Sequence, residues 1–400
     1  MKQEHKPIRW LYLAVGTVVL LFAGIVYAWS ILKAPLAEEF GWTASQLTLN
    51  FTLTMCFFCL GGMLAGVLLK KLGFRVTTIL SGVLACLGFV LAGGVGQNVV
   101  LLYLSYGLLA GLGIGMTYNC IISTVSAWFA DKKGLCSGVL MMGFGASALI
   151  LGSLANSLIA APAVGWRMTY RVIGFALGVV LMLAALVLRR PEAPQGAAKQ
   201  AVGGEADAPP AQMLRSANFW KAFLCIVFLC AMGNTVISMA RDLALSVGAA
   251  AQTATLLVGL LSVCNGLGRV ITGAVFDKLG RRSTMIAANI LTICAAGVTL
   301  LSIVTGSVAL CVAGLCLTGL SYGTCPTISS AFTSEMFGQR FFSMNFPIMN
   351  CNLIFASFIA TGASKINEAS GGYATSFILL LALCVVALLL NFSIRERKKD

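Results

Sequence analysis

The stretch from Thr255 to Phe276, TLLVGLLSVCNGLGRVITGAVF, is apolar and long enough to cross a bilayer as a helix, yet it carries one arginine, Arg269. A cation at that depth costs about 2.5–3.5 kcal/mol on insertion scales, so it needs a partner, a water-filled cavity or an anionic ligand. Every other Lys and Arg lies at or beyond the end of an apolar segment. The stretch therefore predicts a membrane-spanning fold that holds one positive charge where an anion could meet it.

The composition indicates an all-α integral membrane protein. Of 400 residues, 59% are hydrophobic and only 10% are charged, whereas about a quarter of a soluble domain is charged. A helix needs about 20 apolar residues to cross the hydrocarbon core, and the chain contains twelve such segments, which we number as spans one to twelve. They cover roughly residues 10–32, 46–69, 76–96, 99–128, 134–158, 168–188, 218–240, 250–276, 283–305, 307–332, 341–363 and 373–392.

The placement of the basic residues predicts the topology. A net charge of +14 is compatible with a nucleic-acid partner, but the Lys and Arg residues follow the alternation of the loops. If the N-terminus is cytoplasmic, 21 of the 27 basic residues fall on the cytoplasmic side, 5 fall outside and Arg269 is the remaining one. Cytoplasmic loops carry an excess of Lys and Arg. We therefore expect a multi-pass protein of the plasma membrane with both termini in the cytoplasm.

Residues 189–216 interrupt the apolar pattern with Pro, Gly, Ala and charged residues, which is typical of a flexible linker. This linker separates six spans in residues 1–188 from six spans in residues 217–400. We expect each set of six to form one helical bundle.

The two halves repeat each other at a nearly constant offset. The matching pairs are Gly66 with Gly273, at 207 positions, and Gly111 with Gly319, Gly115 with Gly323 and Phe129 with Phe337, each at 208 positions. A duplicated six-helix unit is typical of transporters, whose binding site lies near the membrane midplane between the repeats. The glycine pairs themselves have the spacing of close helix crossings, and we interpret them as packing residues.

The loop after span eight, Gly273-x-x-x-Asp277-Lys278-x-Gly280-Arg281-Arg282, together with its weaker copy after span two, resembles the major facilitator superfamily. Three further stretches are similar to its oxalate/formate antiporter family. These stretches are Tyr27 to Ser30 followed by Pro35, Trp128 to Gly134, and Asn265 to Arg269. The resemblance covers essentially the whole chain. It implies two pseudo-symmetric six-helix bundles and the transport of small carboxylates, in a family related to the monocarboxylate porters.

Helical spacing places Ser262, Asn265, Arg269 and Thr272 on one face, a polar stripe that suits a helix lining a wet cavity. The resemblance implies that the arginine binds the substrate carboxylate, a task for which the bidentate guanidinium is suited. Two alternatives stay open: Arg269 could bind carbonyl groups of a broken helix, or its side chain could reach the cytoplasmic surface. We expect Arg269 to bind substrate, with Asn265 beside it.

The acidic residues are informative by their positions. All 13 Asp and Glu residues fall in loops or at the ends of spans, so Arg269 has no obvious counter-ion within the membrane. This distribution favours an anionic ligand as the partner of Arg269. It disfavours a proton relay of buried carboxylates and the export of cations, which usually needs an embedded acid.

Span eleven indicates the charge of the ligand. The resemblance implies a lysine there in oxalate carriers, whereas residues 341–363 contain no Lys or Arg. The span offers Asn345, Asn350, Asn352 and Ser357 instead, of which we place Asn352 in the site. One cation matches one carboxylate, so we expect a monocarboxylate such as formate, lactate, pyruvate or a hydroxy acid, and a poor fit for oxalate.

Three tyrosines complete the predicted binding site. Tyr27, Tyr118 and Tyr322 lie within spans one, four and ten. The resemblance implies aromatic residues at similar places, where they clamp a small flat anion and help to enclose it. The alternative is that these tyrosines pack at helix interfaces with their hydroxyl groups satisfied.

The loop after span eight is also a candidate gate. Asp277 stands near Arg281 and Arg282 at helix ends, where a carboxylate beside arginines could latch the cytoplasmic face in one conformation. We place Asp131, after span four, with these gating residues. The copy after span two has Lys70 where the pattern expects an Asp.

These observations favour a secondary transporter of small organic anions that works by alternating access, with exchange of one carboxylate for another. The alternatives are a proton-coupled monocarboxylate symporter and an exporter of lipophilic compounds, although an exporter would be expected to have a wide apolar cavity and embedded acids. An enzyme would need His, Asp, Glu or Cys clusters, whereas the 14 Cys are scattered and the single histidine, His5, is in the N-terminal tail. We expect a monomer in the lipid bilayer, with no cofactor, metal or nucleic acid.

Overall fold

The computed structural model describes residues 6–129, 133–189, 208–338 and 341–394, and these residues form helices without a strand. The first half contains α1 (Lys6–Ala23), η1 (Gly24–Ala28), α2 (Trp29–Leu32), α3 (Ala34–Phe40), α4 (Ala44–Lys71), α5 (Gly73–Ala92), α6 (Val99–Leu102), η2 (Tyr103–Ala110), α7 (Gly111–Ser126), α8 (Lys133–Ser147), η3 (Ala148–Gly152), α9 (Ser153–Ala160) and α10 (Gly165–Val187). The second half contains α11 (Pro210–Arg215), α12 (Ala217–Ser246), α13 (Ala251–Thr305), α14 (Val308–Phe337), α15 (Phe342–Asn350), α16 (Asn352–Ser370) and α17 (Ala374–Phe392). Here η1 is a 3₁₀ segment, whereas η2 and η3 are π-helical.

Among the described residues, 12 helical segments are long and apolar enough to cross a membrane, which confirms the predicted number of spans. Spans one, four, five and eleven each consist of consecutive shorter helices, whereas α13 contains both span eight and span nine. Gly280 separates the two spans of α13, because its φ of 73° and ψ of 178° cannot continue a helix. Glycine adopts a positive φ without a clash between a Cβ and the backbone.

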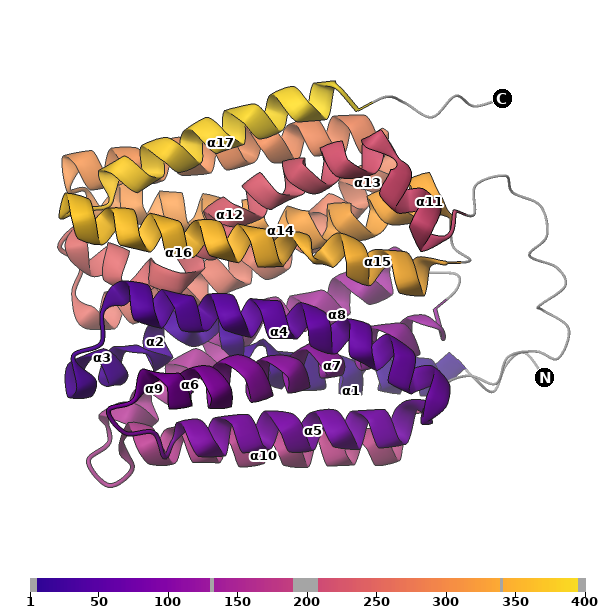
Figure 1. Ribbon diagram of the computed structural model, residues 1–400, viewed down its shortest axis with the longest axis horizontal. Coiled ribbons are helices and arrows are strands. Elements are labelled where there is room, and N and C mark those ends of the chain that lie inside the picture. The colour runs from indigo at the N-terminus through magenta and orange to yellow at the C-terminus, as the bar shows by residue number, and fades with distance from the viewer. Residues whose placement is uncertain (1–5, 130–132, 190–207, 339–340, 395–400) are drawn as a thin grey trace, which may run out of the picture.

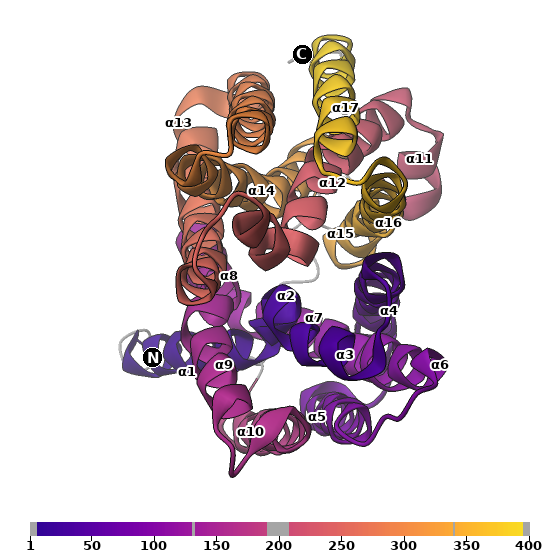
Figure 2. The same cartoon turned by 90° about the vertical axis from the view of Figure 1, so that its left-hand side faces the viewer.

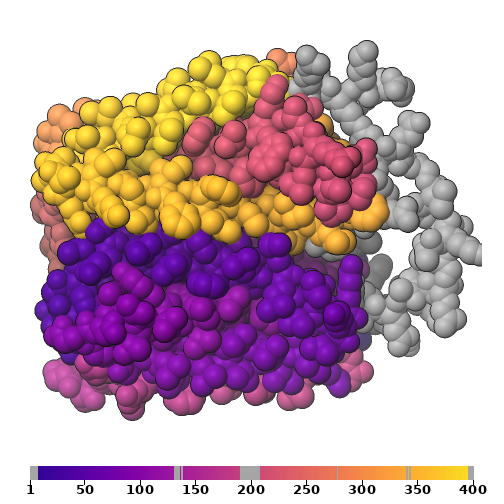
Figure 3. Space-filling view, in the orientation of Figure 1, coloured from indigo at the N-terminus to yellow at the C-terminus, as the bar shows by residue number. Residues whose placement is uncertain are grey.

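The spans run side by side along one axis and gather in two groups (Figure 1). Helices α1–α10 form the first group and α12–α17 form the second, with a seam between them on the surface (Figure 3). Viewed along the spans, the two groups face each other (Figure 2). Helix α1 begins and α17 ends at the same end of the molecule, which we call the terminal end, and α3 lies at the opposite, distal end.

Close helix crossings repeat in the two groups. A Cβ at Gly115 in α7 would lie 2.0 Å from the carbonyl oxygen of Phe58 in α4, and a Cβ at Gly323 in α14 would lie 2.2 Å from the carbonyl oxygen of Asn265 in α13. Phe58 and Asn265 are themselves 207 positions apart, the offset of the sequence repeat. Glycine is therefore needed at both crossings so that the backbones can meet, and the two groups share one packing plan.

Two spans are interrupted where they reach the same cavity. Span one tightens into η1, which contains Tyr27, and such 3₁₀ stretches within a helix often mark a hinge. Gly24 makes this approach possible, because a Cβ there would lie 2.1 Å from the carbonyl oxygen of Phe144 in α8. Span eleven breaks at Cys351, between α15 and α16, four residues after Pro347 has removed a backbone donor. Residues beside both interruptions line the cavity.

The end of the predicted linker is ordered. Residues 210–215 form α11, which buries Met213, so this part of the 189–216 segment is not the flexible chain that its composition predicted. The backbone N–H of Ala208 donates to the carbonyl oxygen of Phe337 at 3.1 Å, and the side chain of Asn345 donates to the carbonyl oxygen of Ala208 at 2.9 Å. These contacts fasten the chain to the terminal end of the second group before α12 begins.

Candidate functional site

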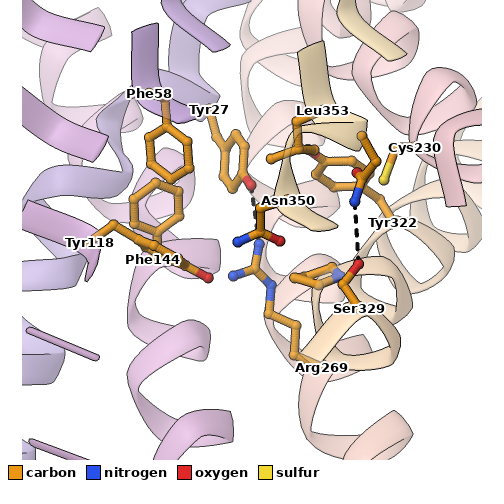
Figure 4. Close-up of a pocket in the computed structure, with 12 residues that line it drawn as sticks. Tyr27, Phe58, Tyr118, Phe144, Cys230, Arg269, Tyr322, Ser329, Asn350 and Leu353 are labelled. Atoms are coloured by element: carbon orange, nitrogen blue, oxygen red, sulfur yellow. Dashed lines mark hydrogen bonds between the residues drawn. The ribbon is translucent and has the colours of Figure 1, made fainter. Parts of the chain in front are cut away.

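A small cavity lies between the two groups of helices. The first group contributes four aromatic side chains to its wall, Tyr27, Phe58, Tyr118 and Phe144, and the second group contributes Cys230, Arg269, Tyr322, Pro326, Ser329, Asn350, Asn352 and Leu353. Figure 4 shows the rings of the first group on one side and the guanidinium of Arg269 pointing toward them. The cavity volume is about 20 Å³. One water needs roughly 10–15 Å³ on this measure, so the structure is closed around the site.

Arg269 is buried and turned inward, with only 2% of its surface exposed. Its Nε donates to Oδ1 of Asn265 at 3.2 Å, one helical turn earlier in α13. Its Nη1 donates to the carbonyl oxygen of Met141 in α8 at 3.3 Å, and its Nη2 donates to the hydroxyl of Tyr27 at 3.2 Å. The side chain therefore does not reach toward the terminal end, and two of its three hydrogen bonds cross from the second group to the first.

Arg269 has no ionic partner among the described residues. In the described part of the chain, no carboxylate pairs with it, and its three acceptors are an amide, a backbone carbonyl and a hydroxyl. The guanidinium also stands 5.9 Å from the centre of the Tyr27 ring, where the face of the ring attracts a cation. Neutral acceptors satisfy the hydrogen bonds of a guanidinium but leave its net charge, which favours an anion as a further partner.

The aromatic side of the cavity is a connected cluster of rings. The ring of Phe144 lies 5.1 Å from that of Tyr27 and 5.3 Å from that of Tyr118, both edge to face. Phe58 lies 5.2 Å from Tyr118, and Tyr322 reaches across from the second group to 5.9 Å from Tyr27. The three tyrosines that the sequence indicated therefore meet at one cavity, and rings packed in this way hold a shaped and largely apolar wall.

Amide and hydroxyl groups stand on the second group's side of the cavity. The Nδ2 of Asn352 donates to the carbonyl oxygen of Met349 at 2.6 Å and to Oγ of Ser329 at 3.4 Å. The carbonyl oxygen of Asn350 accepts from Sγ of Cys59 in the first group at 3.3 Å. Both asparagines flank the break at Cys351, which turns successive polar residues of span eleven toward the site. The described part of the cavity wall contains no second cation.

The predicted polar stripe of α13 is buried along its length. Ser262, Asn265 and Thr272 are exposed by 5% or less, like Arg269 between them. Asn265 does not line the cavity but holds the Nε of Arg269, and its own Nδ2 has no partner in the described structure. Its place in the site is therefore to orient the guanidinium.

The predicted gating residues are only partly described. Arg281 is buried and its Nε lies 3.4 Å from Oε1 of Glu335, in α14 of the same group, while its guanidinium lies 5.8 Å from the centre of the Phe332 ring. Arg282 is exposed at the surface. Asp131 and the side chain of Asp277 lie outside the described residues, so the latch between Asp277 and the arginines stays a prediction.

Several cavity residues were missed by sequence reasoning. Phe58 is the repeat counterpart of Asn265, so the offset of 207 positions could have indicated that Phe58 lies near the site. Asn350 was one of four polar residues considered in span eleven, and pattern alone gave no reason to prefer it. Phe144, Cys230 and Ser329 carry no signal in the sequence, because ordinary core residues of distant helices become neighbours only when the helices pack together.

The comparisons with known proteins agree with this architecture. The chain matches the model of the Major Facilitator Superfamily over residues 13–350 and 222–400. It is 27% identical over 382 residues to the oxalate:formate antiporter of Oxalobacter formigenes, which covers 95% of this chain and 90% of that protein. It is 28% identical over 176 residues to monocarboxylate transporter 2 of Homo sapiens, which covers 42% of this chain and 35% of that protein.

The fold is also shared with a solved structure. The crystal structure of a D-xylose-proton symporter superposes with a TM-score of 0.75 at 17% sequence identity, covering 97% of this chain and 98% of that one. At this identity the likeness concerns the fold alone. Together with the family match, it confirms the predicted fold class of two six-helix bundles.

Proposed function

This chain belongs to the Major Facilitator Superfamily, and from that premise we propose that it carries small monocarboxylate anions across the membrane by alternating access and anion exchange. The observation that carries the proposal is Arg269, a buried guanidinium between the two helix groups that binds neutral acceptors. The names of two relatives, an oxalate:formate antiporter and a monocarboxylate transporter, support a carboxylate as the cargo.

The number of charges at the site favours a monoanion. A carboxylate can accept two parallel hydrogen bonds from one guanidinium, which fully compensates one negative charge. A second carboxylate on the same molecule would face the amides of Asn350 and Asn352, which donate hydrogen bonds but carry no charge. Burial of an uncompensated charge is costly, so oxalate should bind less well than a monocarboxylate.

The aromatic wall favours a small and flat substrate. Tyr27, Phe58, Tyr118 and Phe144 enclose one side of a cavity that is closed to about the volume of a water. A formate or short-chain carboxylate would need the two groups to part by little, whereas a bulky lipophilic compound would need the ring cluster to be dismantled. The small enclosed cavity therefore disfavours the export of large lipophilic compounds.

The contacts of Arg269 suggest why exchange would be faster than net transport. A bound carboxylate would neutralise Arg269 before the groups reorient, whereas the empty carrier would have to move an uncompensated cation within the membrane. The described residues place no carboxylate beside Arg269 that could neutralise it in the empty carrier and then release it by accepting a proton when substrate binds. We infer a cycle in which one carboxylate enters as another leaves.

We infer further that the terminal end faces the cytoplasm and that the protein works as a monomer in the plasma membrane. Of the 27 Lys and Arg residues, 21 belong to the loops and tails expected on that side. This assignment fixes which mouth of the carrier meets which compartment, and the distal end is then the external one.

The test is uptake by proteoliposomes that contain the purified protein. A panel of labelled carboxylates would comprise formate, acetate, lactate, pyruvate and oxalate, with and without unlabelled substrate inside. We expect a monocarboxylate to be preferred and internal substrate to accelerate uptake of label. If uptake ignores internal substrate and follows an imposed pH gradient, proton symport replaces exchange, and if no carboxylate is taken up, the proposed cargo is wrong.

A further inference from the structure

The two helix groups are joined by an ion pair at the distal end. The Nζ of Lys33, which follows α2 in the first group, lies 2.7 Å from Oδ2 of Asp242 in α12 of the second group. The side chain of Lys33 is 5% exposed and that of Asp242 is 34% exposed. Lys33 is thus a nearly enclosed cation whose ionic partner, Asp242, belongs to the group that has to move away.

Burial makes this pair sensitive to separation of the groups. A lysine ammonium that is almost withdrawn from water is costly unless a carboxylate stays in contact with it. Each ion is therefore stabilised by the other when the distal ends are together, and by water when the ends part far enough to hydrate both groups. Intermediate separations would leave Lys33 buried and unpaired, which makes the contact behave as a latch with two positions.

Further contacts join the two groups at the distal end and along the seam. The Oε1 of Glu368, at the distal end of α16, accepts a hydrogen bond of 2.5 Å from the backbone N–H of Ser45 in the first turn of α4. A carboxylate is favoured at that place because the N-terminus of a helix carries a partial positive charge. Deeper along the same seam, the hydroxyl of Thr52 lies 2.6 Å from that of Thr361. Two carboxylates of the second group, those of Asp242 and Glu368, thus bind the ammonium of Lys33 and the N-terminus of α4 in the first group.

On the terminal side of the cavity, the described contact between the two groups is of another kind. There Cys351 of the second group meets Met63 of the first through sulfur atoms 3.9 Å apart, a weak contact. The described ion pair of Arg281 with Glu335 lies within the second group and does not join the two. Apart from the hydrogen bonds of Arg269 at the cavity, the charged contacts described between the groups lie at the distal end.

We propose that Lys33 and Asp242 form the electrostatic latch that holds the distal side of the carrier closed, and that this pair separates when the cavity opens toward that side. The latch goes beyond the proposed cargo, because it concerns access to the cavity whatever molecule binds there. It also differs from the predicted latch at Asp277, which lies at the other end of the molecule.

Cys230 is a native reporter for this opening. It lines the cavity and is 1% exposed in the closed structure, so a charged thiol reagent that does not cross membranes can reach it only through an open mouth. Modification of the wild type, of Asp242→Asn and of Lys33→Gln would be timed by mass spectrometry of the Cys230 peptide in sealed vesicles. The reagent would be applied to each side separately, with a protease-cleavable tag at the C-terminus to identify the side that holds the termini.

We expect either substitution to accelerate Cys230 modification about tenfold from the side opposite the tag, without acceleration from the tag's own side. The charge-reversed double variant Lys33→Asp with Asp242→Lys should return toward the wild-type rate. Should a single variant prove unstable, the double variant Lys33→Gln with Asp242→Asn leaves no buried charge unpaired and should also be fast. Cys230→Ser identifies the labelled peptide.

The matched control is an ion pair on the same distal face that does not join the groups. Arg167 lies 2.6 Å from Glu39 within the first group, and hydrogen bonds from Trp166 and Arg167 hold the pKa of Glu39 below its usual value, so the pair is intact at neutral pH. Arg167→Gln should change the rate less than twofold. The latch would be overturned if the single variants modified Cys230 no faster than this control does. It would also be overturned if the charge-reversed variant were as fast as the single variants. Neither outcome would affect the proposed anion site.

Discussion

The guanidinium of Arg269 donates a hydrogen bond of 3.2 Å to the hydroxyl of Tyr27, which precedes it by 242 residues and belongs to the other group of helices. Nη2 carries a second N–H, so an anion that binds this nitrogen shares it with Tyr27 or displaces Tyr27 from it. Binding at Arg269 is therefore linked to a contact between the two groups, which is the contact that alternating access has to change.

Arg269 should be indispensable for binding. Removal of one partner from a buried, hydrogen-bonded charge pair costs about 2–5 kcal/mol, which corresponds to a loss of about 30-fold or more in affinity. We expect Arg269→Gln to abolish measurable uptake and Arg269→Lys to restore only part of it, because an ammonium lacks the bidentate geometry. Uptake by proteoliposomes and substrate-induced thermal stabilisation would be measured, with Arg171→Gln at the exposed distal surface as the control. Normal uptake by Arg269→Ala would refute the anion site.

The substitution Tyr27→Phe removes the hydroxyl and keeps the ring, so it tests the two contributions separately. The ring contacts with Phe144 and Tyr322 remain, but the Nη2 of Arg269 loses its acceptor, and an unsatisfied buried donor costs about 1–3 kcal/mol. A carboxylate can replace the lost acceptor in the loaded carrier, whereas the empty carrier has no substitute. We expect net uptake to fall more than exchange, so the ratio of exchange to net uptake should rise several-fold. A proportional fall in both rates would instead indicate that Tyr27 only shapes the cavity.

The charge preference should respond to a second cation in span eleven. Wild-type protein should prefer monoanions, and Asn352→Lys should shift preference toward dicarboxylates such as oxalate, because its side chain lines the cavity with Arg269. Competition by unlabelled formate, lactate and oxalate against a labelled monocarboxylate would measure the shift. Asn345→Lys is the matched control, since Asn345 binds the carbonyl oxygen of Ala208 and does not line the cavity. Wild-type protein that binds oxalate more tightly than formate or lactate would contradict the argument from the missing lysine.

The paired glycine crossings should be intolerant of a methyl group. A Cβ at Gly115 or Gly323 would lie 2.0 or 2.2 Å from a backbone oxygen of the neighbouring helix, so the helices would have to move apart. We expect Gly115→Ala and Gly323→Ala to lower the melting temperature in detergent, each by more than 5 °C. Gly297→Ala is the control, because no neighbour lies within 4 Å of its Cβ position and alanine favours a helix by up to about 1 kcal/mol. Equal melting temperatures for all three variants would contradict the crossing geometry.

Much of the architecture was predictable because it depends on local rules. Each run of about 20 apolar residues must satisfy its own backbone hydrogen bonds in hydrocarbon, so it becomes a helix wherever it lies in the molecule. The repeat of glycines at one offset likewise predicted the two packing crossings, since backbone contact needs the absence of a Cβ at a fixed helical position. The ordered end of the linker was not predictable, because α11 depends on the surface that buries Met213.

The sequence by itself determined that this protein crosses the membrane with 12 spans and that Arg269 stands among apolar neighbours, because burial in lipid and helical periodicity are properties of consecutive residues. The tertiary structure alone decided that Phe58, Phe144 and Asn350 share a cavity with that arginine. It also decided that Lys33, which lies just beyond the first apolar span, is buried against Asp242. Contacts between residues far apart in the sequence leave no periodicity in the chain, and they exist only because distant helices, and the two helix groups, pack against each other.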